Sequence, residues 1–125
     1  MKSLLVIMSL TVALLSLGLG QKSNAYQNLQ VLPQDIPREQ LSSLMKGFTQ
    51  ALGVRCSFCH VGEGDDLSTY DFPSDKKPSK AQARVMLGMV DHINREFLPN
   101  VAHDEYHSPE VTCMTCHRGK VNPEY

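Results

Sequence analysis

The segment Cys56-Ser57-Phe58-Cys59-His60 recurs as Cys113-Met114-Thr115-Cys116-His117, and these two copies of C-x-x-C-H contain all four cysteines of the chain. This pattern is the attachment motif of c-type haem. Each thiol adds to one vinyl group of the porphyrin, and the imidazole of the next residue then lies where it can ligate the iron. The sequence therefore predicts two covalently attached haems (heme c). The attachment residues are Cys56, Cys59, Cys113 and Cys116, and the proximal iron ligands are His60 and His117.

Two other chemistries also use paired C-x-x-C motifs: a four-cysteine zinc site and a pair of redox disulfides. Neither requires a histidine directly after the second cysteine. Zinc ribbons space their pairs by roughly 15 to 20 residues, whereas 53 residues separate Cys59 from Cys113. Haem is the favoured interpretation, and zinc and disulfides remain the alternatives.

Residues 1–25 have the features of a secretory signal peptide. A single early cation, Lys2, precedes an apolar run, and Ser23 and Ala25 suit the small positions before a cleavage site. The expected mature chain is a dihaem cytochrome c domain over residues 26–125. The alternative is an uncleaved membrane anchor, because Ser3 to Gly20 approaches the roughly 18 residues that can span a bilayer.

Export agrees with covalent haem, because c-type haems are attached outside the cytoplasm. We therefore expect the protein in the periplasm or on the outer face of the cytoplasmic membrane. Loss of residues 1–25 leaves 10 basic against 13 acidic groups, a formal charge of −3. Nucleic acid and anionic membrane surfaces are poor partners for such a chain. We expect redox partner proteins instead, with membrane contact only through a partner or a retained N-terminal anchor.

The hydrophobic pattern predicts a mainly α fold: two repeats of an amphipathic helix followed by a haem motif, with little or no sheet. The first helix is expected from an Asp35 cap to a stop at Gly53. The second is expected from a Ser79 cap to about Leu98, before Pro99. Residues 61–78, rich in Gly, Asp, Ser and Pro, read as a surface loop. The apolar faces of the two helices are Leu41, Leu44, Met45, Phe48 and Leu52, and Met86, Met89, Val90, Ile93 and Phe97.

The coordination position opposite each proximal histidine can hold a thioether or a second imidazole, or it can stay open. Met45 lies on the apolar face of the first helix, 11 residues before Cys56, and is the candidate for the first haem. Its alternative role is ordinary core packing. For the second haem the spacing leaves several candidates, namely Met86, Met89, His92, His103 and His107.

Four stretches together resemble the cytochrome c subunit of photosynthetic reaction centres. They are Asn28-Leu29-Gln30-Val31-Leu32, the helix with Leu44-Met45 leading into Gly53-Val54-Arg55 and the first motif, the segment from Ala83 to Asn94, and the segment from Val111 to Gly119. In that family a helix methionine is the usual sixth ligand. The resemblance implies Met45 and Met89 as distal ligands, since Met89 occupies the methionine before Val-x-x-Ile-Asn. Typical members carry four haem motifs in two similar halves, so this chain resembles a half-length dihaem version.

The resemblance implies electron transfer, with re-reduction of a photo-oxidised pigment pair and with reaction-centre subunits or soluble cytochromes as partners. One alternative is a free-standing periplasmic dihaem carrier outside photosynthesis. Another is a haem redox enzyme of the peroxidase or nitrogen-oxide reductase type, which needs an open iron with acid, base or cationic groups placed above it. Nothing in the spacing of His103, His107, Arg84 and Arg95 demands such a site, so we expect an electron carrier rather than an enzyme.

Overall fold

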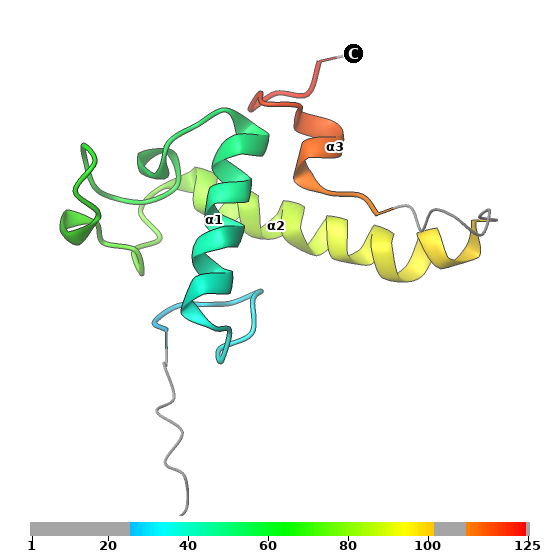
Figure 1. Cartoon of the computed structure of the whole chain (residues 1–125), viewed down its shortest axis with the longest axis horizontal. Helices are drawn as coiled ribbons and strands as arrows, with labels where there is room; N and C mark the ends of the chain where they lie inside the picture. Colours follow the sequence, from blue (N-terminus) through cyan, green and yellow to red (C-terminus); the bar gives the residue numbers. More distant parts are fainter. Residues whose placement is uncertain (1–25, 102–109, 125) are drawn as a thin grey trace, which may run out of the picture.

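The computed structural model describes residues 26–101 and 110–124, and this part of the chain is almost entirely helical (Figure 1). Its only extended pairing, within those residues, is an isolated antiparallel bridge between Val61 and Asp71. The predicted mainly α fold is confirmed. The elements are α1 (Arg38–Leu52), η1 (Cys56–Phe58), η2 (Leu67–Thr69), α2 (Pro78–His92), η3 (Ile93–Phe97), η4 (Leu98–Asn100) and α3 (Cys113–His117).

The predicted signal peptide lies outside the described residues, as do His103 and His107. Among the helices of the described part, none combines the length and the apolar character needed to cross a bilayer.

Helix α1 ends where the sequence predicts but begins differently. Gly53 adopts the left-handed conformation, with φ 64°, and its N–H donates to the Gln50 carbonyl at 3.4 Å. At the other end, Pro37 is the N-cap, and its carbonyl accepts from the Leu41 amide at 2.9 Å. The expected Asp35 cap is wrong, because the extended Pro37 separates Asp35 from the first turn.

Helix α2 also begins without the predicted cap. Lys77 is its N-cap residue and Pro78 takes the first helical position, where a missing N–H costs no hydrogen bond. Ser79 is therefore inside the helix, and its hydroxyl donates to the Phe58 carbonyl at 2.5 Å. The chain stays helical to Asn100, but η3 is a π turn and η4 a 3-10 turn.

The segment between η1 and α2 is a folded loop rather than a simple acidic surface. Tyr70 is buried, and its hydroxyl donates to the Gly64 carbonyl at 2.9 Å. Its ring lies so close to Gly62 that a Cβ there would be 2.4 Å from Tyr70 Cγ. Asp66 is exposed, and its carboxylate accepts from the Ser68 amide at 3.0 Å. The acidic groups therefore surround a small packed interior.

Very little of the described polypeptide is buried. Its buried apolar residues are Ile36, Ala51 and Tyr70. The predicted apolar face of α1 is only half-buried. On α2 and η3, Met86, Met89 and Phe97 are 44 %, 48 % and 60 % exposed. Both helices thus present large apolar surfaces that the described chain itself does not cover, and such surfaces usually mark binding sites.

The end of α1 meets the turn after α3 in close backbone contact, which we call the glycine junction (Ala51, Gly53 and Gly119). The Gly119 N–H donates to the Ala51 carbonyl at 2.8 Å. A Cβ on Gly53 would lie 2.0 Å from the Gly119 oxygen. Figure 1 shows α3 beside the C-terminal end of α1, with α2 crossing α1 and continuing below α3 in that view. Cys56 and Cys116 each lie three residues from a junction glycine, so each is at most about 11 Å of chain away from it.

The junction predicts opposite effects for two glycine substitutions in or next to α1. Gly53→Ala combines a positive φ with a clash against the Gly119 carbonyl, so we expect a loss of about 2 kcal/mol or more of unfolding free energy. Gly47→Ala is the matched control. It lies within α1 with no atom within 4 Å of the added Cβ, so it should gain about 0.5–1 kcal/mol. Denaturant unfolding followed by circular dichroism measures both, and equal stability of Gly53→Ala and the unmodified protein would contradict the close contact.

Candidate haem-attachment sites

The first C-x-x-C-H motif folds as a compact turn. The Cys59 amide donates to the Cys56 carbonyl at 3.3 Å and the His60 amide to the same carbonyl at 3.0 Å. Cys56 and Cys59 are half-buried and form no disulfide. Burial raises the pKa of the Cys59 thiol, opposed by the Ser79 hydroxyl and the Lys77 ammonium. Both sulfurs are therefore free for attachment to a porphyrin.

The N-terminal end of α2 binds the two residues between these cysteines. Lys77 Nζ donates to the Ser57 carbonyl, and the Ser79 hydroxyl donates to the Phe58 carbonyl. Sequence reasoning missed both contacts, because they join positions about 20 residues apart. They fix the first motif to α2.

The proximal candidate His60 is half-buried. Its ring packs edge-on against Phe72 with ring centroids 5.0 Å apart, and Phe72 stacks on Tyr70. Its Nδ1 is buried without a hydrogen-bond partner, although the Phe72 backbone lies near enough to raise the pKa of the ring slightly. Burial, followed by the charges of Lys80 and Arg84, lowers the pKa of His60 overall. The neutral imidazole is the form that ligates a metal.

A polar cluster beside His60 joins Asn28, the loop before α2 and α2 itself. Asp75 pairs with Lys80 Nζ at 3.2 Å and with Arg84 Nη1 at 2.9 Å. Lys80 Nζ also donates to the Phe72 carbonyl at 2.8 Å, and Arg84 Nη2 to the Asn28 carbonyl at 3.2 Å. The Asn28 amide, together with the two cations, lowers the pKa of Asp75 to about 2. The cluster therefore fixes the loop that carries Phe72 over His60.

The second motif forms α3 itself. A capping box between Thr112 and Thr115 begins the helix, and the Arg118 amide donates to the Met114 carbonyl at 3.1 Å at its end. His117 Nδ1 lies 3.0 Å from the Lys120 carbonyl oxygen. A proton on Nδ1 donates to that oxygen and leaves Nε2 free to ligate, which is how metal-binding histidines are usually oriented. Cys113 and Cys116 form no disulfide, and burial raises the pKa of the Cys113 thiol.

The candidates for the sixth ligand lie on the two long helices. Met45 is half-buried in the middle of α1. Met86 and Met89 are similarly exposed on α2, so the structure leaves the choice between them open. His92 is exposed and packs its ring against Phe97, with centroids 5.4 Å apart.

The donor set and the apolar surfaces fit haem better than zinc. Within the described residues, no three potential ligands among His, Cys, Asp and Glu converge on one point. His117 has its Nδ1 engaged and Nε2 free. The helices before the motifs carry half-covered apolar faces, where a large flat apolar group would pack. The residues present therefore fit two covalently attached haems.

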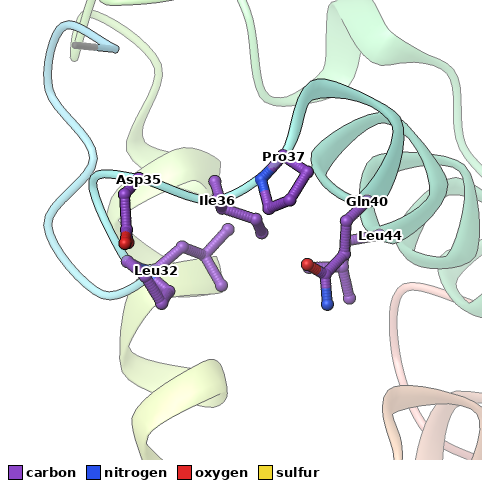
Figure 2. Close-up of a pocket in the computed structure, with 7 residues that line it drawn as sticks. Leu32, Asp35, Ile36, Pro37, Gln40 and Leu44 are labelled. Atoms are coloured by element: carbon purple, nitrogen blue, oxygen red, sulfur yellow. The ribbon is translucent and has the colours of Figure 1, made fainter. Parts of the chain in front are cut away.

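A separate cavity of about 310 Å³ lies at the start of α1 (Figure 2). Leu32 and Ile36, from the lead-in (residues 26–37, the segment before α1), face Gln40 and Leu44 of α1 across it. None of the predicted site residues lines this cavity. It results from the way the lead-in turns into α1 at Pro37.

Paired C-x-x-C-H turns on a small helical scaffold define a c-type cytochrome. A family model described as "Photosynthetic reaction centre cytochrome C subunit" matches residues 11–125. The chain belongs to this family, a family of electron-transfer cytochromes, which implies c-type haem as the cofactor.

Individual relatives agree with this assignment. Cytochrome c-554 of Chloroflexus aurantiacus is 33 % identical over 95 residues, covering 76 % of this chain and 21 % of that protein. The photosynthetic reaction center cytochrome c subunits of Roseobacter denitrificans and Thermochromatium tepidum are 35 % and 31 % identical, covering 68 % and 82 % of this chain and 24 % and 23 % of those proteins. The matched region thus spans about a quarter of the length of these relatives.

The polar cluster predicts a pH-dependent role for Asp75. Because its folded pKa is depressed, its stabilising effect is present above the ordinary value of 3.8 and is lost as the pH falls toward about 2. Asp75→Asn should therefore lower the melting temperature at pH 7, and the difference from the unmodified protein should shrink below pH 4. Glu63→Gln, an exposed acid of the same loop outside this cluster, is the control. A difference for Asp75→Asn that stays constant down to pH 2 would contradict the assignment.

Proposed function

We propose that this chain is a dihaem electron carrier. The observation that carries the proposal is the presence of two complete C-x-x-C-H turns on one scaffold, both next to the glycine junction. Cys56 and Cys59 attach the first haem, and Cys113 and Cys116 the second. Each haem, when bound, supplies an iron that accepts and releases one electron between its ferric and ferrous forms.

The residues around each attachment site orient the proximal ligand. Burial and the neighbouring cations lower the pKa of His60, and its ring packs against Phe72. His117 is oriented by the contact between its Nδ1 and the Lys120 carbonyl. For His60 the lowered pKa favours the neutral ring, whose lone pair can bind iron.

Met45 and Met89 are proposed as the distal ligands, on helices α1 and α2. A thioether at the sixth position closes the site to small molecules and favours ferrous iron compared with imidazole. Met45 is half-buried, which suits a side chain on α1 that would reach toward a haem packed against this helix. Closed sites with methionine ligands suit an electron carrier with comparatively high potentials, rather than an enzyme.

The short path between the motifs supports exchange of electrons within the chain. The Gly119 amide bonds directly to Ala51, only five residues before Cys56. The glycine junction therefore brings the two attachment segments to the same end of α1. An electron that enters at one haem would then leave at the other.

The proposed partners are redox proteins outside the cytoplasm. The names of two relatives associate them with photosynthetic reaction centres, which supports re-reduction of a photo-oxidised pigment pair by this chain. Because the chain matches only about a quarter of those proteins, a free-standing periplasmic carrier is the alternative assignment. In both cases we propose export by the signal peptide over residues 1–25, giving a mature chain that begins at Tyr26.

Haem content tests the proposal directly. The exported protein should carry two haems that resist acid-acetone extraction, measured as intact mass and by a denatured haem assay. Cys113→Ala or Cys116→Ala should leave at most one securely attached haem and a less stable C-terminal half, because a small core would lose one of its covalent cross-links. Met114→Ala, between the same cysteines, is the control and should keep both. A mass corresponding to one haem or none would refute the dihaem carrier.

The ligand assignment predicts distinct effects of methionine substitutions. Met45→His and Met89→His should each lower the potential of one haem without releasing it, because imidazole stabilises ferric iron relative to thioether. Met45→Ala and Met89→Ala should each let the reduced protein bind carbon monoxide. Met86→Leu is the control and should change neither property. Rapid carbon monoxide binding by the unmodified protein would favour an enzyme, and loss of the methionine-to-iron charge-transfer band in Met86→Leu alone would identify Met86 as the ligand.

A further inference from the structure

The side chain of Asn94 joins α2 to the segment that carries the second haem motif. Its Nδ2 donates to the Val111 carbonyl at 2.8 Å, and its Oδ1 accepts from the Val111 amide at 2.8 Å. One amide therefore satisfies both backbone groups of Val111, as a neighbouring strand would. In the described part of the chain, these two hydrogen bonds are the ones that join the α2–η3 helix to residues 110–124.

The two bonded residues are rigidly connected to the two proposed iron ligands. Met89 precedes Asn94 by five residues, and the Ile93 amide bonds to the Met89 and Val90 carbonyls, so this stretch is a continuous helix. On the other side, Val111 leads directly into the capping box that begins α3, the helix that contains His117. The relative position of Met89 and His117 therefore depends on the contact between Asn94 and Val111.

The local backbone supports a specific role for this contact. Asn94 lies in η3, a five-residue π turn directly after α2. A π turn holds more residues than an α turn, so it rotates the side chains that follow it, and single π turns are frequent at functional sites. The departure from the α conformation occurs where Asn94 reaches Val111. Asn94 is half-buried, so leaving the Val111 groups unpaired would cost free energy.

We propose that Asn94 is a positioning residue for the second haem: it fixes α3 relative to α2 so that the Met89 thioether and the His117 imidazole could both hold the same iron. This inference rests on the proposed ligand pair. The thioether is a neutral and comparatively weak ligand, so a small displacement of α3 detaches methionine before histidine. The cysteines keep the haem attached in either case.

Two substitutions at Asn94 separate its hydrogen bonds from its packing. Asn94→Ala removes both bonds. Asn94→Asp has the same shape but places a carboxylate oxygen against the Val111 carbonyl. Both variants should keep two haems by mass. Both should lose roughly half of the methionine-to-iron charge-transfer absorbance, and the reduced proteins should bind carbon monoxide at about one haem of the two.

Asn100→Ala is the matched control, because among the described residues Asn100 Nδ2 donates within its own helical segment, to the Glu96 carbonyl at 2.7 Å. It should show the unmodified band and no carbon monoxide binding. If Asn94→Ala and Asn94→Asp lower only the melting temperature and leave the band intact, Asn94 has a purely structural role and the proposal is overturned.

Met89→Ala distinguishes failure of this inference from failure of the ligand assignment. If Met89→Ala loses half of the band while the Asn94 variants lose none, only the positioning role is wrong. If Met89→Ala keeps the full band, the ligand assignment is wrong and the role of Asn94 is overturned with it. Amide hydrogen exchange in the unmodified holoprotein tests the contact even if the variants do not accumulate. The Val111 amide should exchange slowly, and exchange at the rate of an exposed amide would overturn the proposal.

Discussion

The backbone contact between Gly119 and the end of α1 is the constraint on which the arrangement of the two motifs depends. Gly53 ends α1 in a left-handed conformation, and the space a Cβ would need there is occupied by the Gly119 carbonyl. The Gly119 amide completes the contact by bonding to Ala51. Only glycine allows so close an approach of two chain segments. Because each glycine lies three residues from a motif cysteine, this single contact places both attachment sites near the same end of α1.

Helix α2 supplies the second connection between the motifs. At its N-terminal end, Lys77 and Ser79 bind the carbonyls of the residues between Cys56 and Cys59. Beyond its C-terminal end, Asn94 binds the residue before the α3 cap. Each motif is thus held by side chains of one continuous helical segment and by the backbone at the glycine junction. Hydrogen bonds hold the motifs in place because the described chain has few buried apolar residues.

Local features of the site could be predicted from the sequence, and contacts distant in sequence could not. The two motifs, the apolar helix faces and the stop at Gly53 follow from short-range spacing, and the structure confirms the helices and the stop. The Asp35 and Ser79 caps were wrong because Pro37, two residues after Asp35, and Pro78, directly before Ser79, set the two helix starts. The contacts of Lys80, Asn94 and Gly119 depend on tertiary packing, which no periodicity encodes. Met86 and Met89 share one face and similar exposure, so neither sequence nor structure separates them.

The small number of buried residues links stability to the cofactor. Ile36, Ala51 and Tyr70 lie in different parts of the chain: the lead-in, α1 and the loop. Three such residues bury far too little apolar area to offset the conformational entropy of ordering a domain of this size. The exposed side chains of Met86, Met89 and Phe97 are the surface on which additional burial can occur. In a dihaem carrier, haem would cover such surfaces, so the same contacts that ligate iron would also complete the core. Residues such as Asn94 would then act on ligation and stability together, which is why spectra and melting temperatures must be measured side by side.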